Sequence, residues 1–382
     1  MINRIDIVGS FLPPEKLTDT VRLYDSGLIG QDKLLETENE AIGQLVERLI
    51  EAGLREVTSG ELRRRQWDKD FWFGLAGIRR ERVDNGHIYQ PLDLYTDLMR
   101  FTGPIGFNPE HPFFYDFSFL RKVAGGRANC RQTIPSPANL YLEILSMTGG
   151  NPELIYPTDR NLLSDIAESY NLTIRNFYSL GCRHIQFDDT ACGMLCDGCY
   201  TKRLLQGGID IIALHEQIIN LFNDAVSGLP ADMEVSLFLS GGDTIVPEWE
   251  FLRFPDNIMP KVLSLVNASK FFLPFDTRND YQLEVLRHIP DGKKVVLGLL
   301  DAHSPLTDDG NDIIDTIVKA SAFIDPSLLS ISPRTGFKLS SYQSRGLTYE
   351  DQWTKLARLG ELLRYSKADH GMFPNGPTIK KY

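Results

Sequence analysis

Short apolar segments alternate with helical patterns along the chain, and this alternation limits the fold more than any other feature. Eight segments have the length and composition of strands: residues 4–10, 55–60, 130–134, a fourth that begins at His184, 234–239, 270–276, 294–301 and 328–332. Helical patterns cover residues 32–53, 161–180, 209–226, 256–266 and 349–363. Eight strands that alternate with helices predict an α/β fold of the (β/α)8 TIM-barrel class, with a parallel open sheet as the alternative.

Residues 62–127 interrupt this alternation. The segment is rich in aromatic residues, especially in the stretch HPFFYDFSFL. We interpret it as an insertion between the second and third strands that packs on the barrel, and a lid over a pocket is the alternative. Because no linker or repeat is found, residues 1–382 are predicted to form a single TIM-barrel domain.

The composition excludes several classes of protein. The formal net charge of −11 argues against a nucleic-acid surface, which requires a basic stripe. The basic run at residues 63–65 is interpreted as a solvated helix start, with a phosphate or carboxylate clamp as the alternative. The sequence contains no run of 18 apolar residues, so no membrane span is predicted. Since the N-terminus lacks the apolar region of a signal peptide, we expect a cytoplasmic protein.

Polar side chains follow the predicted strands, and in a barrel they would meet at one mouth. These residues are Ser10, Glu61, Ser136, Asp188, Asp189, Ser240, Asp276, Asp301, His303, Arg334 and Thr335. Carboxylates outnumber cations among them, which favours a substrate with an amino group, or a metal. Each acid alone could instead cap the next helix. His303 is the histidine best placed for acid–base chemistry, because imidazole titrates near neutral pH.

The fourth strand begins the stretch HIQFDDTACGMLCDGCY, which joins two carboxylates to three cysteines. We expect the cysteines to lie in a loop after Asp188 and Asp189. The spacing of Cys192, Cys196 and Cys199 can hold an iron–sulfur cluster or supply three thiolates to zinc. The alternative is that these thiols are small buried apolar groups.

Several of these segments, taken in order, carry a resemblance to a known family. They are VGSFLPPEKL, EAGLREVTSGELRRRQW, TIPSPANLYL, HIQFDDT, LSGGD, KVVLGLLDAHS and SPRTGF. The chain resembles the cobalamin-independent methionine synthase family, in particular short members similar to its catalytic C-terminal half. The resemblance implies a TIM barrel whose mouth binds homocysteine and a methyl-tetrahydrofolate. It also implies that Ser10 holds the carboxylate of the amino acid, while Glu61 and Asp188 hold its ammonium group.

The zinc site of this family is not matched. The family implies four ligands: a histidine and a cysteine after the fifth strand, a glutamate at the sixth, and a cysteine after the eighth. Here the corresponding positions are occupied by Phe238, Ser240, Pro274 and Thr335. Because no cysteine follows Cys199, a shift in the alignment cannot restore the pattern.

Three functional hypotheses follow. The first is an enzyme that transfers a methyl or one-carbon group to a thiol amino acid such as homocysteine without zinc, with Asp189 or His303 as the base and methyl-tetrahydrofolate as the donor. The second is another barrel enzyme, such as a lyase or a metal or iron–sulfur enzyme that uses the three cysteines. The third is a non-catalytic protein that binds an amino acid or a folate. Fold alone does not choose among them.

Overall fold

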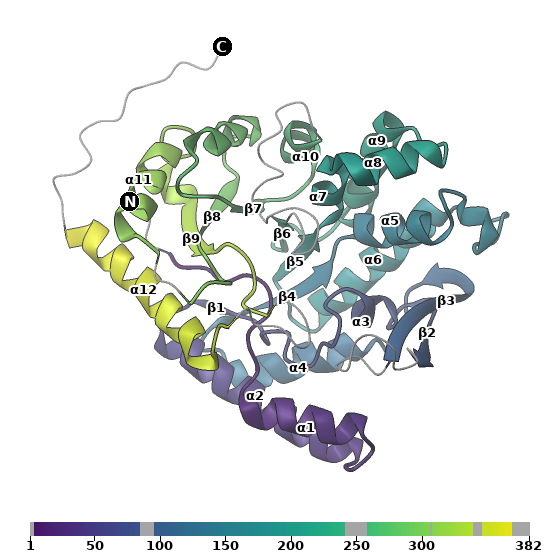
Figure 1. The fold of residues 1–382 in the computed structure, drawn as a ribbon, viewed down its shortest axis with the longest axis horizontal. Coiled ribbons are helices and arrows are strands. Elements are labelled where there is room, and N and C mark those ends of the chain that lie inside the picture. The colour runs from purple at the N-terminus through teal and green to yellow at the C-terminus, as the bar shows by residue number, and fades with distance from the viewer. Residues whose placement is uncertain (1–3, 85–94, 241–257, 306–307, 339–345, 369–382) are drawn as a thin grey trace.

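The computed structural model describes residues 4–84, 95–240, 258–305, 308–338 and 346–368, and they form an α/β fold around a curled parallel sheet (Figure 1). The seven strands follow in the order β1 (Glu56–Val57), β4 (Asn129–Pro135), β5 (His184–Asp189), β6 (Glu234–Leu239), β7 (Lys270–Pro274), β8 (Lys294–Leu300) and β9 (Leu329–Pro333). Each neighbouring pair is parallel. This arrangement confirms the predicted α/β class and is consistent with a TIM-like barrel.

Residues 4–10 do not form a ladder of strand hydrogen bonds. Ile5 makes an isolated parallel bridge with Ile331 of β9, and the Asp6 N–H donates to the Ile331 carbonyl at 2.8 Å. The Ile7 carbonyl accepts instead from the guanidinium of Arg131. The predicted first strand is therefore wrong in extent, because a buried arginine side chain takes a position that a strand ladder would use.

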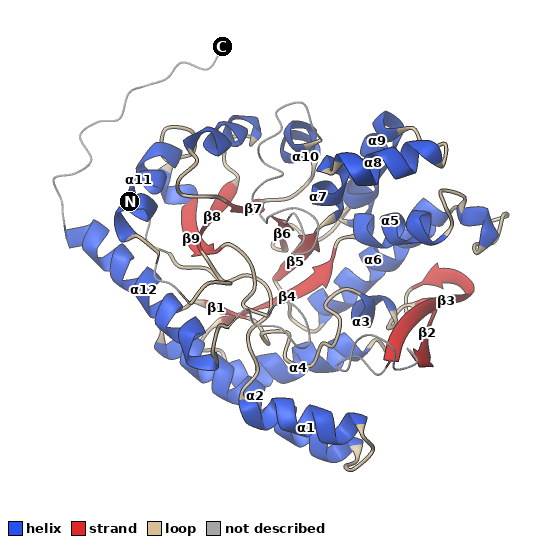
Figure 2. Cartoon of the chain, in the orientation of Figure 1, coloured by secondary structure: helices blue, strands red, loops and turns tan. Residues whose placement is uncertain are grey.

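Helices surround the curled sheet (Figure 2). The longer ones are α1 (Glu15–Asp25), α2 (Gln31–Glu51), α4 (Pro112–Ala124), α5 (Pro137–Met147), α6 (Leu162–Ser179), α9 (Ile211–Ala225), α11 (Gly310–Ala320) and α12 (Tyr349–Ala368). The predicted helix over residues 256–266 is shorter, α10 (Met259–Leu265), and its first two residues lie outside the described ranges. No helix of the described ranges combines the length and apolar character needed to cross a membrane.

The start of α5 coincides with a Pro-Ser-Pro sequence, a composition that also suits a turn. Pro137 occupies the first helical turn, where the missing N–H costs nothing, and the Ser136 hydroxyl accepts the N–H of Ala138. Residues that also suit a turn therefore begin a helix here.

Residues 62–127 contain regular structure. Strands β2 (Ala76–Asp84) and β3 (Tyr95–Gly106) form an antiparallel pair, and the short helix α3 (Lys69–Trp72) precedes them. The aromatic stretch forms α4, where Phe113 and Phe117 are buried. The interpretation of this segment as an insertion within a single domain stays a prediction.

Strand side chains alternate between two faces of the curled sheet. On β5, Ile185 and Phe187 join the large core between the sheet and the helices. A second, separate apolar cluster consists of Val8, Phe238, Phe272 and Val296. Because these residues come from β6, β7, β8 and the N-terminal segment and are separate from the large core, they fill the interior of the curled sheet.

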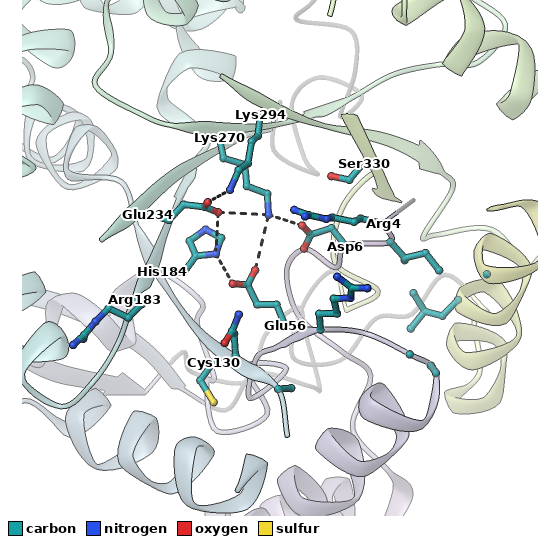
Figure 3. A pocket seen from close by; sticks show the side chains of 18 of the residues that line it. Arg4, Asp6, Glu56, Cys130, Arg183, His184, Glu234, Lys270, Lys294 and Ser330 are labelled. Atoms are coloured by element: carbon teal, nitrogen blue, oxygen red, sulfur yellow. Dashed lines mark hydrogen bonds and ion pairs between the residues drawn. The ribbon is translucent and has the colours of Figure 1, made fainter. Parts of the chain in front are cut away.

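A layer of charged side chains occupies the interior where the strands begin (Figure 3). His184 Nδ1 lies 2.7 Å from Glu56 Oε1, and Lys270 Nζ lies 2.5 Å from Asp6 Oδ2. Arg131 Nη1 contacts Asp6 at 2.8 Å and Glu56 at 2.9 Å. A cavity of about 1100 Å³ opens beside this layer. Since these charges pair with one another, the layer has the features of a structural element that holds the strands together.

We predict that Arg131→Met lowers the free energy of unfolding by about 3–5 kcal/mol, because Asp6 and Glu56 would lose their buried cation. Urea unfolding at neutral pH measures the change. Arg127→Met is the matched control, since Arg127 pairs with Glu47 at the surface and should contribute little. A loss below about 1 kcal/mol in Arg131→Met would contradict a structural role for the layer.

Candidate active site

The carboxylate of Glu61 is the centre of the polar groups at the opposite end of the sheet. It is buried, with 4% of the residue exposed. The Ser10 hydroxyl donates to its Oε2 at 2.5 Å, and the Thr133 hydroxyl donates to its Oε1 at 2.8 Å. Arg64 Nη1 lies 3.1 Å from Oε1. Glu61 therefore joins the N-terminal segment, β4 and its own loop at the mouth of the barrel, and the predicted pair of Ser10 and Glu61 is in direct contact.

The backbone that presents Glu61 is unusual. Gly60 and Glu61 both have positive φ, at 62° and 57°. A Cβ at Gly60 would lie 2.4 Å from the side chain of Leu45, so only glycine fits there. A non-glycine residue such as Glu61 pays roughly 1–2 kcal/mol for the left-handed conformation. Such strain occurs where a side chain must be held in one direction.

A close crossing of two loops holds Ser10. A Cβ built on Gly336 would lie 2.4 Å from the Ser10 nitrogen, and one on Gly9 would lie 2.6 Å from the Gly336 nitrogen. The Phe337 N–H donates to the Ser10 carbonyl at 2.7 Å. The loop after β9 is thereby packed against the hydroxyl that contacts Glu61.

Asp188 ends the interior face of β5 and is 6% exposed. The Gln186 side-chain amide donates to Asp188 Oδ1 at 2.6 Å. Burial, and then the nearby negative charge of Glu61, raise the pKa of Asp188 to about 7. The free site therefore holds a carboxyl group whose ionised form is disfavoured and would be stabilised by a bound cation.

Asp189 faces the other side of β5. Its Oδ1 accepts the N–H of Cys192 at 2.9 Å, and the side chains of Ser136 and Cys192 also hydrogen-bond to it. Burial raises the pKa of Asp189 despite these bonds. The carboxylate thus caps the helix that follows, and the structure separates it from the group around Glu61. Its predicted role as a base is not favoured by this position.

His303 lies after β8 and is buried. Its Nε2 is 3.1 Å from the Thr335 hydroxyl and 3.1 Å from the Gly336 carbonyl. Since Gly336 crosses the loop that carries Ser10, His303 belongs to the mouth of the barrel. This placement is compatible with the predicted acid–base role.

The four residues that the resemblance predicts at the zinc positions do not fit that metal. Phe238 belongs to the interior apolar cluster, and Pro274 is the last residue of β7. Ser240 and Thr335 are buried hydroxyl residues. Zinc sites in proteins use thiolate, imidazole or carboxylate ligands, and these four side chains supply none.

The three clustered cysteines lie on two short helices, α7 (Ala191–Cys196) and α8 (Gly198–Gln206), so the predicted loop is wrong. The cause is local, because Asp189 and Asp197 accept backbone N–H groups at the starts of these helices. Burial raises the pKa of Cys196 to about 12, which disfavours its thiolate. In the described part of the chain, no group of three or more His, Cys, Asp or Glu side chains could hold a metal ion.

Two cationic residues of the site were not identified from the sequence. Arg64 is 7% exposed and pairs with Glu61, so the interpretation of residues 63–65 as a solvated helix start is wrong for Arg64, and the alternative of a carboxylate clamp describes it. Lys338 Nζ donates to the Arg64 carbonyl at 3.2 Å, and burial lowers the pKa of Lys338 although Glu61 opposes this. The only feature of the sequence that could have indicated Arg64 and Lys338 is that each lies a few residues after a predicted strand.

Comparisons with known proteins show what the chain resembles. No family model matches it. It is 29% identical to the uncharacterized protein YxjG of Bacillus subtilis over 361 residues, which cover 94% of this chain and 93% of YxjG. It is 23% identical to the methionine synthase of Sulfolobus acidocaldarius over 334 residues, which cover 87% and 85% of the two chains.

Solved structures give the same result. A Listeria monocytogenes protein classed with vitamin-B12-independent methionine synthases has a TM-score of 0.72 and 29% identity, with 95% of this chain and 99% of that one covered. A B12-independent methionine synthase from Shewanella, in complex with selenomethionine, has a TM-score of 0.67 and 17% identity, with 97% and 99% covered, and shows the shared fold. The resemblance to cobalamin-independent methionine synthases is therefore confirmed.

We predict that Asp188→Asn stabilises the protein at alkaline pH. A buried acid whose pKa is raised from 3.8 to about 7 destabilises the native state increasingly as pH rises through this interval. The variant lacks this penalty, so its free energy of unfolding should exceed that of the wild type by up to about 4 kcal/mol at pH 8 and by little near pH 4. Denaturant unfolding at both pH values tests this, with exposed Asp224→Asn as control. Equal stability at pH 8 would contradict the raised pKa.

Proposed function

We propose that this protein is a methionine-synthase-like transferase that moves a methyl or one-carbon group to the sulfur of a thiol amino acid such as homocysteine. The observation that carries the proposal is the arrangement of Ser10, Glu61 and Asp188 at the mouth of the barrel. Two buried carboxyl groups and a hydroxyl suit the ammonium and carboxylate of an amino acid. Methionine-synthase-like relatives that cover most of the chain support it.

On binding, the amino acid would replace hydrogen bonds that the site residues make with one another in the free protein. The ammonium group lies between Glu61 and Asp188 in this proposal, and its charge ionises Asp188. The Ser10 hydroxyl, which donates to Glu61 in the free protein, turns to the substrate carboxylate. The selenomethionine complex of the Shewanella protein supports an amino acid as the occupant of this type of barrel.

The transfer step requires a nucleophilic sulfur. In our proposal the thiol loses its proton by way of His303, and the sulfur lone pair forms a bond to the methyl carbon of a methyl-tetrahydrofolate. The bond from that carbon to the folate nitrogen breaks, and the nitrogen keeps the electron pair and takes a proton. No step is assigned to zinc, since the residues at its family positions do not fit it. Of the two bases suggested by the sequence, His303 is preferred because Asp189 caps a helix.

We predict that the purified protein forms methionine from homocysteine and methyl-tetrahydrofolate, and that a metal chelator does not change the rate. Glu61→Gln should lower kcat/KM by roughly 10- to 100-fold, because it removes one charged hydrogen bond to the substrate. Glu168→Gln, on the exposed surface of α6, is the control and should be fully active. Mass spectrometry of the product measures the rate.

Other results of this assay would change the assignment. Loss of activity with chelator would contradict metal-free activation of the sulfur. Binding of homocysteine without turnover with any methyl donor would refute transfer and support a binding protein.

We also predict that methionine binding strengthens as pH rises toward 7. Only the ionised form of Asp188 attracts the ammonium group, so below its pKa of about 7 the affinity should fall by roughly tenfold per pH unit. Isothermal titration calorimetry between pH 5.5 and 8 measures this dependence and the protons released. In Asp188→Asn the affinity should be weaker and nearly independent of pH. A wild-type affinity that does not vary over this range would refute the contact between Asp188 and the ammonium group.

A further inference from the structure

Arg334 directly follows β9, at the mouth of the curled sheet. Its N–H donates to the Leu300 carbonyl at 2.8 Å, which ties the residue to the end of β8. On β9, Leu329 and Ile331 join the large core between sheet and helices. Because side chains alternate between the two faces of a strand, Arg334 is expected on the interior face.

The backbone of Arg334 passes directly over the interior of the sheet. A Cβ built on Gly298 of β8 would lie 2.9 Å from the Arg334 Cα and 3.2 Å from the Pro274 Cα. Gly298 shares its face with Val296, which belongs to the interior cluster. The absence of a side chain at Gly298 therefore makes room for Arg334 above the interior, beside Pro274.

The guanidinium of Arg334 is buried without a full set of partners. The residue is 8% exposed, and its buried Nε has no hydrogen-bond partner among the residues that the structure describes. Arg131 also has an unpartnered Nε, but its Nη1 pairs with Asp6 and Glu56. Arg64 pairs with Glu61. A buried guanidinium that is not paired with a carboxylate destabilises the folded protein. Arg334 therefore has the features of a group that binds an anionic ligand.

The groups near Arg334 are also suited to an anion rather than a metal cation. The adjacent Thr335 carries a hydroxyl that lies 3.1 Å from His303 Nε2. A guanidinium and a hydroxyl both donate hydrogen bonds, and arginine stays charged at all physiological pH values. This part of the mouth therefore carries positive charge and hydrogen-bond donors, whereas the part formed by Glu61 and Asp188 carries carboxyl groups.

We propose that Arg334 binds the sulfur of the thiol amino acid as a thiolate. The inference rests on the proposed function and names how the acceptor is activated in a site whose residues do not fit zinc. The S–H bond gives up its proton to the solvent by way of His303, and the negative sulfur is held against the guanidinium. A neighbouring cation can bring a thiol of ordinary pKa about 8.5 down to roughly 3.5–7.5, which is enough for ionisation at neutral pH.

The ultraviolet absorbance of the thiolate tests this directly. Homocysteine is added to the wild-type protein at pH 7, and the difference spectrum reports how much of the bound ligand is ionised. We expect a thiolate signal close to one per bound ligand in the wild type and its loss in Arg334→Met. Arg334→Lys keeps the charge and should retain part of the signal. Arg278→Met is the matched control, because Arg278 follows β7 of the same sheet but its side chain is 77% exposed.

Methionine serves as the second probe, since its thioether cannot ionise. Its binding should be the same in wild type and Arg334→Met within about threefold, which also shows that the variant is folded. A thiolate signal that persists unchanged in Arg334→Met overturns the inference, and so does a wild-type complex in which homocysteine remains a neutral thiol. Failure of both amino acids to bind the wild type refutes the proposed function itself. If an amino acid with a carboxylate in place of the thiol binds more tightly than homocysteine, the thiolate is not the anion that Arg334 binds, and the inference is overturned.

Discussion

The buried guanidinium of Arg131 is the interaction on which the rest of the structure depends. It extends from β4 across the interior and contacts Asp6, Glu56 and the Ile7 carbonyl. These contacts hold the N-terminal segment between β9 and β1, where backbone pairing is limited to an isolated bridge. Ser10 lies in the same segment, three residues after Ile7. Ionic contacts at the other end of the interior therefore contribute to the position of this hydroxyl, together with the loop crossing at Gly9 and Gly336.

Most of the fold could be predicted from the sequence, because strand and helix patterns depend on local periodicity. Six of the predicted strands overlap β4 to β9, and the second overlaps the short β1. The first failed because the group that satisfies the Ile7 carbonyl comes from Arg131, 124 residues away. The two helices that carry the cysteines were missed for another reason, since small polar residues begin helices as readily as they form turns. Local sequence does not separate these two uses.

The residue types of the site could be predicted from the sequence, but the directions in which their side chains point were harder to predict. Ser10 and Glu61 were expected to cooperate, and they are in contact. The sequence predicts both Asp188 and Asp189 at the mouth, yet adjacent residues of a strand face opposite sides, so only Asp188 reaches it. This distinction was available from the alternation of Ile185 and Phe187. The burial of Arg64 against Glu61 was not available, because it depends on how the loop folds back at two residues with positive φ.

The charges of the mouth form a pattern that a thiol amino acid would complete. Glu61 is already balanced by Arg64, whereas burial and the nearby charge of Glu61 raise the pKa of Asp188. An ammonium group would supply that charge, and a thiolate would supply the opposite charge near Arg334. A ligand with both groups stabilises two separate buried sites at once, whereas a thioether such as methionine stabilises only the first. The site would therefore hold the acceptor more tightly than the methylated product, which favours release of the product after transfer.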